Sequence, residues 1–152
     1  MKHITLKEAE ALVKKRRKSE RAFYSKNKAF VKKRKKFEEK HCFGYTDCWN
    51  LDNTIAEFLL PRICYFRDNI DTCPSSILMK FAEKNKEDFN SISQNTEDES
   101  FDEWYKILDC IATACYYYLK HSIDAYEIKG EKEEIVKKGL NYLSEYFYSL
   151  WS

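Results

Sequence analysis

Only three glycines and two prolines occur in the 152 residues of this chain. Long runs without a helix-breaking residue remain, and in them apolar residues recur at steps of three and four, which places them on one face of an α-helix. No alternation of apolar and polar residues is long enough to indicate a strand. The sequence therefore predicts an all-α fold: a single domain over residues 1–152, built as a bundle of about five helices.

The N-terminal segment, residues 1–40, is expected to be one long basic helix. Thr5 and Glu8 have the spacing of a capping box, and no glycine or proline follows before Gly44. Three phenylalanines then lie at intervals of seven residues: Phe23, Phe30 and Phe37. We expect this stripe to pack the helix onto the helical body formed by residues 44–152.

Charge is distributed unevenly along the chain. Residues 1–40 hold 16 of the 27 basic residues but only 5 of the 25 acidic ones. Two clusters supply a candidate basic face: Lys14, Lys15, Arg16 and Arg17, followed by Lys32, Lys33, Arg34 and Lys35. Such a face is either simply solvated or binds an anion.

Residues 44–67 form a second candidate site. Polar and aromatic groups stand at a predicted helix start, and two arginines follow along the helix, an arrangement that would suit a phosphate-bearing ligand with a stacking base. The candidate ligand-binding residues are Trp49, Asn50, Asp52, Arg62 and Arg67. The commoner use of such residues is structural: Trp49 in the core, Asp52 as a helix cap, and Arg62 paired with an acid of the last helices.

Several local signals position the remaining helices. Pro61 predicts a kink in the second helix, or a break near Leu60. The polar segment 90–100 reads as a mobile loop, with Ser100 capping the next helix. Gly139, inside the last helix, predicts a close approach to another helix, and Trp151 is expected to pin the C-terminus to the body.

The sequence lacks the motifs of most enzyme classes. His41, Cys42 and Cys48 do not have zinc-knuckle spacing, and glycine-rich phosphate loops are absent, so we expect no metal and no cofactor. One enzymatic alternative is a HEPN-like ribonuclease, because Arg34 and His41 resemble the Arg-x(4-6)-His pattern of that family. The resemblance implies histidine as acid and base and arginine as phosphate contact.

The six cysteines do not indicate a disulfide framework. The N-terminus has no apolar signal-peptide core, and no segment is apolar enough to span a membrane. We therefore expect reduced thiols and a cytoplasmic location.

Residues 44–63 also carry a resemblance. Gly44 to Asp52 and Ile55 to Ile63 resemble the pattern G-[YF]-[ST]-x-x-D-x-W-N-L-D followed by I-A-x-F-[IL]-x-P-R-[IL], with a shorter spacing before Trp49. Later matches lie at Trp104 to Leu108 and Gly139 to Trp151. This is similar to an uncharacterised family of small bacteriophage and gut-virus proteins, and the resemblance implies a phage origin, a helical fold and no particular activity.

Together these features predict a non-enzymatic phage binding protein for an anionic ligand. The leading version sequesters a host nucleotide immune signal in the host cytoplasm, as an anti-defence protein, and another version binds nucleic acid. The alternative is an interaction or structural protein whose basic helix docks on an acidic host protein and whose aromatic surface forms a homo-oligomer. Neither function needs a membrane.

Overall fold

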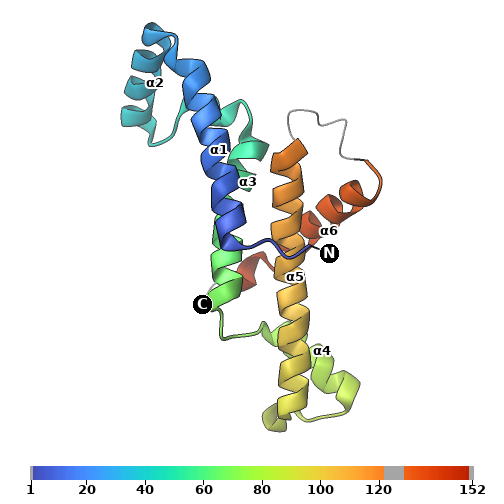
Figure 1. Cartoon of the computed structure of the whole chain (residues 1–152). Helices are drawn as coiled ribbons and strands as arrows, with labels where there is room; N and C mark the ends of the chain where they lie inside the picture. Colours follow the sequence, from blue (N-terminus) through green and yellow to red (C-terminus); the bar gives the residue numbers. More distant parts are fainter. Residues whose placement is uncertain (1, 122–128, 151–152) are drawn as a thin grey trace.

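The computed structural model describes residues 2–121 and 129–150, and these residues form helices and turns without any strand (Figure 1). The α-helices are α1 Leu6–Ser25, α2 Lys28–His41, α3 Leu51–Asn69, α4 Ser75–Asn85, α5 Gln94–His121 and α6 Glu131–Glu145. Short 3₁₀ helices are η1 Tyr45–Cys48, η2 Phe89–Ser91 and η4 Phe147–Ser149. The predicted all-α fold is confirmed.

Helix α5 is the one on which the body assembles. Figure 1 shows it running the length of the body, and α3, α4 and α6 all pack against it. Trp104 and Leu108 of α5 are fully buried. Helix α1 lies against α3 and adds Ala9 and Val13 to the same core. Segments from both halves of the chain therefore share one hydrophobic core.

Helix α6 approaches α5 closely at Gly139. A Cβ atom at this position would lie 2.4 Å from the Cβ of Ala114 and 2.7 Å from the carbonyl oxygen of Cys110. Only a residue without a side chain fits there, so the predicted close approach is confirmed. The expected role of Trp151 lies outside the described residues.

The expectation of one uninterrupted N-terminal helix is wrong. The helix begins with the predicted capping box, in which the Glu8 amide donates to Thr5 Oγ1 at 3.2 Å, but it ends at Ser25. Asn27 has an extended backbone (φ −114°, ψ 96°), and its Oδ1 accepts from the Phe30 amide at 3.0 Å. Asparagine is a strong N-cap because its side chain satisfies a free helix N–H, so it starts a second helix without glycine or proline.

The phenylalanine stripe packs differently from the prediction. Phe23 is 73% exposed and does not contact the core. Phe30 stacks on Tyr24 with ring centroids 4.7 Å apart, and Phe37 lies 5.7 Å from Tyr45 of η1. No residue of α2 is buried. The stripe therefore holds α1, α2 and η1 together as a helical hairpin: it meets residues 44–152 at Tyr45 of η1, and it does not reach the hydrophobic core of the described residues.

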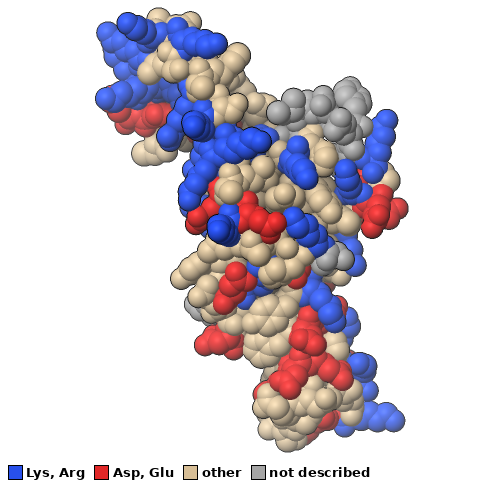
Figure 2. All heavy atoms as spheres, viewed as in Figure 1, with Lys and Arg blue, Asp and Glu red and all other residues tan. Residues whose placement is uncertain are grey.

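We refer to residues 14–41, the later part of α1 and all of α2, as the basic arm. The arm projects from one end of the molecule, while α4 and the start of α5 form the opposite end (Figure 1). Figure 2 shows lysine and arginine side chains gathered over the arm and acidic side chains near the opposite end. The charge asymmetry of the sequence is therefore also an asymmetry in space.

Helix α3 continues through Pro61 as one helix, so the predicted alternative of a break near Leu60 is wrong. Near its C-terminal end, Arg67 is only 2% exposed. Its guanidinium donates to Asp109 Oδ1 at 2.5 Å and to the carbonyl of Ile4 at 3.1 Å. Arg67 thus joins α3 to α5 and to the N-terminal segment.

The expected mobile loop at residues 90–100 is largely helical. Helix α5 already begins at Gln94, and the predicted cap, Ser100, is buried inside it, donating to the carbonyl of Thr96. The Thr96 side chain is fully buried and accepts a 2.7 Å hydrogen bond from Asn85 of α4. Tertiary hydrogen bonds therefore order a segment that looks polar and irregular in sequence.

All six cysteines are free thiols. Burial raises the pKa of Cys64 and Cys73 to about 11 and that of Cys115 to about 12, so these thiols stay protonated at neutral pH. Among the described residues, no helix has the length and apolar character needed to cross a membrane.

Candidate anion-binding site

A cleft of about 430 Å³ lies where the basic arm joins the body, within the usual size range of small-ligand sites. Its walls come from α1, α2, η1 and the first half of α3. Four arginines and three carboxylates line it: Arg16, Arg17, Arg21, Arg34, Glu20, Asp47 and Glu57. Polar and aromatic residues complete the lining: Ser19, Tyr24, Thr46, Asn50, Asn53 and Thr54. We call this the arginine cleft.

Arg16 holds the floor of the cleft together. Its guanidinium pairs with Glu57 Oε1 at 2.9 Å and donates to Asn53 Oδ1 at 2.8 Å. A third hydrogen bond, 2.7 Å long, reaches the carbonyl of Leu119 at the C-terminal end of α5. Arg16 is thus committed to joining α1, α3 and α5.

Arg17 and Arg21 make far fewer contacts with other residues than Arg16 does. The Arg17 Nε is 3.5 Å from Glu57 Oε2, a carboxylate that already accepts from Arg16. Arg21 is exposed, and its guanidinium has no hydrogen bond or ion pair with any other described residue. These two side chains are one helical turn apart on α1, so they can act together on one anionic group.

The opposite wall carries Arg34 and Thr46. Arg34 pairs with Glu38 at 2.7 Å and lies 3.8 Å from Glu20 and 3.9 Å from Asp47, so its charge is balanced locally. The hydroxyl of Thr46 is buried and has no hydrogen-bond partner among the described residues. Buried hydroxyls are normally hydrogen-bonded, which makes Thr46 a candidate contact for a ligand in the cleft.

Of the five predicted ligand-binding residues, only Asn50 lines the arginine cleft. Trp49 is 62% exposed, with its ring edge against Tyr45, so its expected alternative role as a core residue is wrong. Asp52 accepts a short hydrogen bond from the hydroxyl of Tyr118, which holds the pKa of that carboxyl below its usual value. The sequence therefore places these residues correctly at one helix start but not in one pocket.

The two predicted arginines of α3 have opposite environments. Arg62 is exposed, donates to the carbonyl of Phe58 at 2.8 Å, and lies 3.8 Å over the Phe58 ring. It has no acidic partner among the described residues, so the alternative pairing with the last helices is not formed. Arg67 is buried and engaged with Asp68 and Asp109. The structure does not bring Arg62 and Arg67 together around one ligand.

The predicted basic face lies on the arm, but not all of it points outward. Arg16, Arg17 and Arg34 line the cleft, whereas the lysines of both clusters are exposed. Sequence reasoning missed Lys28, which begins a row on the outer face of α2 at spacings of i, i+4, i+7 and i+8: Lys28, Lys32, Lys35 and Lys36. That spacing places the four lysines on one face of any helix through these residues, so the signal was already present in the sequence.

The residues of the ribonuclease alternative lie two turns apart on α2. Arg34 is engaged by the three carboxylates named above, and the His41 ring packs 4.2 Å from the Phe37 ring. Within the described part of the chain, no three His, Cys, Asp or Glu side chains cluster in a way that could hold a metal ion.

Comparison with known proteins gave no match: no protein-family model, no curated protein sequence and no solved structure is similar to this chain. The site must therefore be interpreted from its own chemistry.

Proposed function

We propose that this chain is a non-enzymatic nucleic-acid-binding protein that contacts phosphates through the outer face of the basic arm. The observation that carries the proposal is that α2 contributes no buried residue, yet holds seven basic and two acidic residues among its fourteen. A helix that adds nothing to the core and concentrates positive charge on a projecting arm suits a polyanion.

The balance of charge favours the outer face over the arginine cleft. Four arginines and three carboxylates give the cleft a net charge of +1, and α2 alone carries +5. Lys28, Lys32 and Lys36 are exposed and form no ion pair with any described residue. Each can take a phosphate and release condensed counterions, which is the main source of sequence-independent affinity.

A second candidate function rests on Arg21. Its guanidinium has no partner among the described residues and lines a cleft large enough for a nucleotide, beside Tyr24 and Asn50. In this version the protein would sequester a nucleotide signal, and a nucleotide should raise its melting temperature in proportion to affinity and concentration. Arg21→Gln should then remove the shift.

Fluorescence anisotropy with labelled single-stranded RNA tests the leading proposal. The arm variant replaces Lys28, Lys32 and Lys36 with glutamine, a residue of similar helix propensity. The matched control replaces three exposed lysines outside the arm with glutamine: Lys80, Lys106 and Lys129. Both variants lose the same charge, so only the position of the charge differs.

We expect the arm variant to bind RNA roughly tenfold to a hundredfold more weakly at about 0.1 M salt. Each lost phosphate contact lowers the logarithm (base 10) of the binding constant by about 0.7 at that salt concentration. The control should change affinity by less than about twofold. Equal losses in both variants, or no RNA binding by the wild type, would contradict the proposal. A nucleotide-dependent thermal shift without RNA binding would replace it with the second candidate.

A further inference from the structure

Helix α3 carries a second apolar face that the core does not use. Its inward face packs into the core through Ala56, Leu60, Ile63 and Cys64. Its outward face exposes four large side chains by about half or more of their surface: Leu51 55%, Ile55 48%, Phe58 53% and Tyr65 59%. A helix that only covers a core needs one apolar stripe, so the second one calls for a partner.

The spacing of the outward residues is that of a helix-pairing seam. Leu51, Ile55, Phe58, Arg62 and Tyr65 follow one another at steps of four, three, four and three, the repeat that lets one helix pack along another. The stripe runs for about 21 Å at about 1.5 Å per residue. We call these five residues the α3 stripe; they offer a docking length of about four helical turns.

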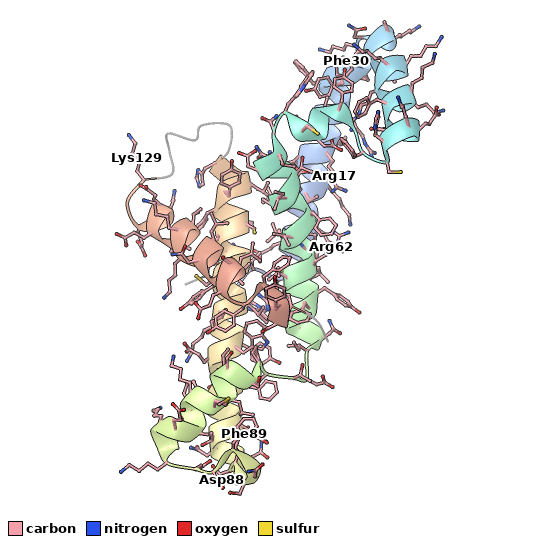
Figure 3. The ribbon with its side chains drawn as sticks, turned by 180° about the vertical axis from the view of Figure 1, so that it is seen from behind. Arg17, Phe30, Arg62, Asp88, Phe89 and Lys129 are labelled. Atoms are coloured by element: carbon pink, nitrogen blue, oxygen red, sulfur yellow. The ribbon has the colours of Figure 1, made fainter. Side chains whose placement is uncertain are left out.

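Positive charge borders the α3 stripe. Arg62 lies within it, stacked on Phe58 and without an acidic partner among the described residues. The arginine cleft adjoins it, because Thr54 and Glu57, which line the cleft, are the chain neighbours of Ile55 and Phe58. Figure 3 shows Arg17 of α1 and Arg62 of α3 on the same side of the molecule.

The acidic groups nearest the α3 stripe already have partners. Glu57 is paired with Arg16, whereas Asp52 accepts from the neutral hydroxyl of Tyr118 and keeps its negative charge. Three arginines, Arg17, Arg21 and Arg62, outnumber that one carboxylate, so the surplus along the α3 stripe is cationic. An acidic partner fits this border, whereas a basic one would be repelled.

A second copy of this chain is disfavoured by the same charges. Pairing the α3 stripe with itself about a two-fold axis would place the Arg62 side chains and arginine clefts of both copies at one interface. Both copies would then bring the same positive surplus into one interface, with no additional acidic group to balance it. Nucleic acid is a poor occupant, since Leu51 and Ile55 are aliphatic and offer nothing to a phosphate.

We infer that the α3 stripe docks an acidic amphipathic helix of another protein, which lays its apolar residues along the stripe while its glutamates or aspartates meet Arg17, Arg21 and Arg62. This is a helix-on-helix recognition mode in which apolar anchors give affinity and the charged border selects the partner. It is separate from the proposed RNA contact, which uses the outer lysines of α2.

Two synthetic helical peptides of about 18 residues, long enough to cover the α3 stripe, test this inference. Both have leucine at heptad positions a and d, and one has glutamate while the other has lysine at the flanking positions. Binding of each labelled peptide to the full chain is measured by anisotropy. Phe58→Ser removes an anchor, and Met79→Ser is its matched control, since Met79 is a similarly exposed apolar residue on α4.

We expect the glutamate peptide to bind wild type and the Met79→Ser control, and to lose about tenfold or more in affinity with Phe58→Ser. Arg62→Glu should weaken the glutamate peptide and strengthen the lysine peptide. The arm variant should bind the glutamate peptide normally, and Phe58→Ser should bind RNA normally, so this inference and the proposed function fail independently.

Three results would overturn the inference. The first is no binding of the glutamate peptide at about 100 μM, the weak end of specific recognition. The second is equal binding of the lysine peptide. The third is a concentration-dependent dimer of the wild type that Phe58→Ser abolishes, which would assign the α3 stripe to a second copy.

Discussion

Arg62 and Arg67 lie five residues apart on α3 and provide a matched test of the fold. Arg62→Met should change the free energy of unfolding little, because the guanidinium is exposed and makes one backbone hydrogen bond. Arg67→Met should cost about 3 kcal/mol, because it removes charge-assisted bonds to the half-buried Asp109 and to the buried carbonyl of Ile4. The pair with Asp68 adds little, since that carboxylate is 41% exposed.

Urea unfolding followed by circular dichroism would measure both variants. A loss of about 3 kcal/mol in Arg67→Met is a substantial part of the stability of a typical domain and lowers the melting temperature on the order of 10 °C. Methionine keeps the apolar bulk of the arginine stem in both variants, so packing differs little between them. If the two variants differ by less than about 1 kcal/mol, Arg67 is not the structural anchor that its contacts indicate.

Two further predictions concern single contacts. Gly139→Ala should destabilise the chain by about 1–3 kcal/mol despite the higher helix propensity of alanine, because the added Cβ meets α5. The control Asn141→Ala, at an exposed position nearby, should be neutral or stabilising in the same thermal melt. Equal behaviour of the two variants would refute the close approach. Tyr118→Phe should cost roughly 1 kcal/mol at pH 7 by removing the hydrogen bond to Asp52. Because the pKa of Asp52 is lowered, this stabilisation is present above pH 3.8, the ordinary pKa of that carboxyl, and is lost as pH falls below 3.8. Burial and the Asp52 carboxylate raise the pKa of Tyr118 to about 12, so the stabilisation also fades as pH rises from 10 to 12. A pH-independent difference in urea unfolding between wild type and Tyr118→Phe would contradict the pairing.

The fold class could be predicted from local sequence signals, whereas the helix boundaries that were predicted wrongly depend on tertiary contacts. Scarce helix breakers and regular apolar spacing suffice to predict helices. Asn27 costs little inside a helix, so only the packing of Tyr24 and Phe30 around the turn reveals that it is a cap. The start of α5 was hidden for a similar reason, because Thr96 is polar but becomes buried against Asn85 of α4.

The candidate site was less accessible from sequence. One signal was available: Arg67 continues the core-facing spacing of Ala56, Leu60 and Ile63, which marks it as buried, whereas Arg62 lies on the outer face. The arginine cleft was not predictable, since its walls meet only because the chain reverses at Asn27. Clusters of basic residues indicate an anion-binding segment, but not which of its side chains remain free.

The salt dependence of RNA binding tests the central proposal most directly. Anisotropy titrations of wild type, arm variant and control across about 50–200 mM salt give the slope of log affinity against log salt concentration, which counts released counterions. If Lys28, Lys32 and Lys36 each hold a phosphate, the arm variant should lose about 2 units of slope, since each contact to a single strand contributes about 0.7, and the control should keep the wild-type slope. An unchanged slope in the arm variant would show that these lysines do not contact the phosphates, and the proposed function would be wrong.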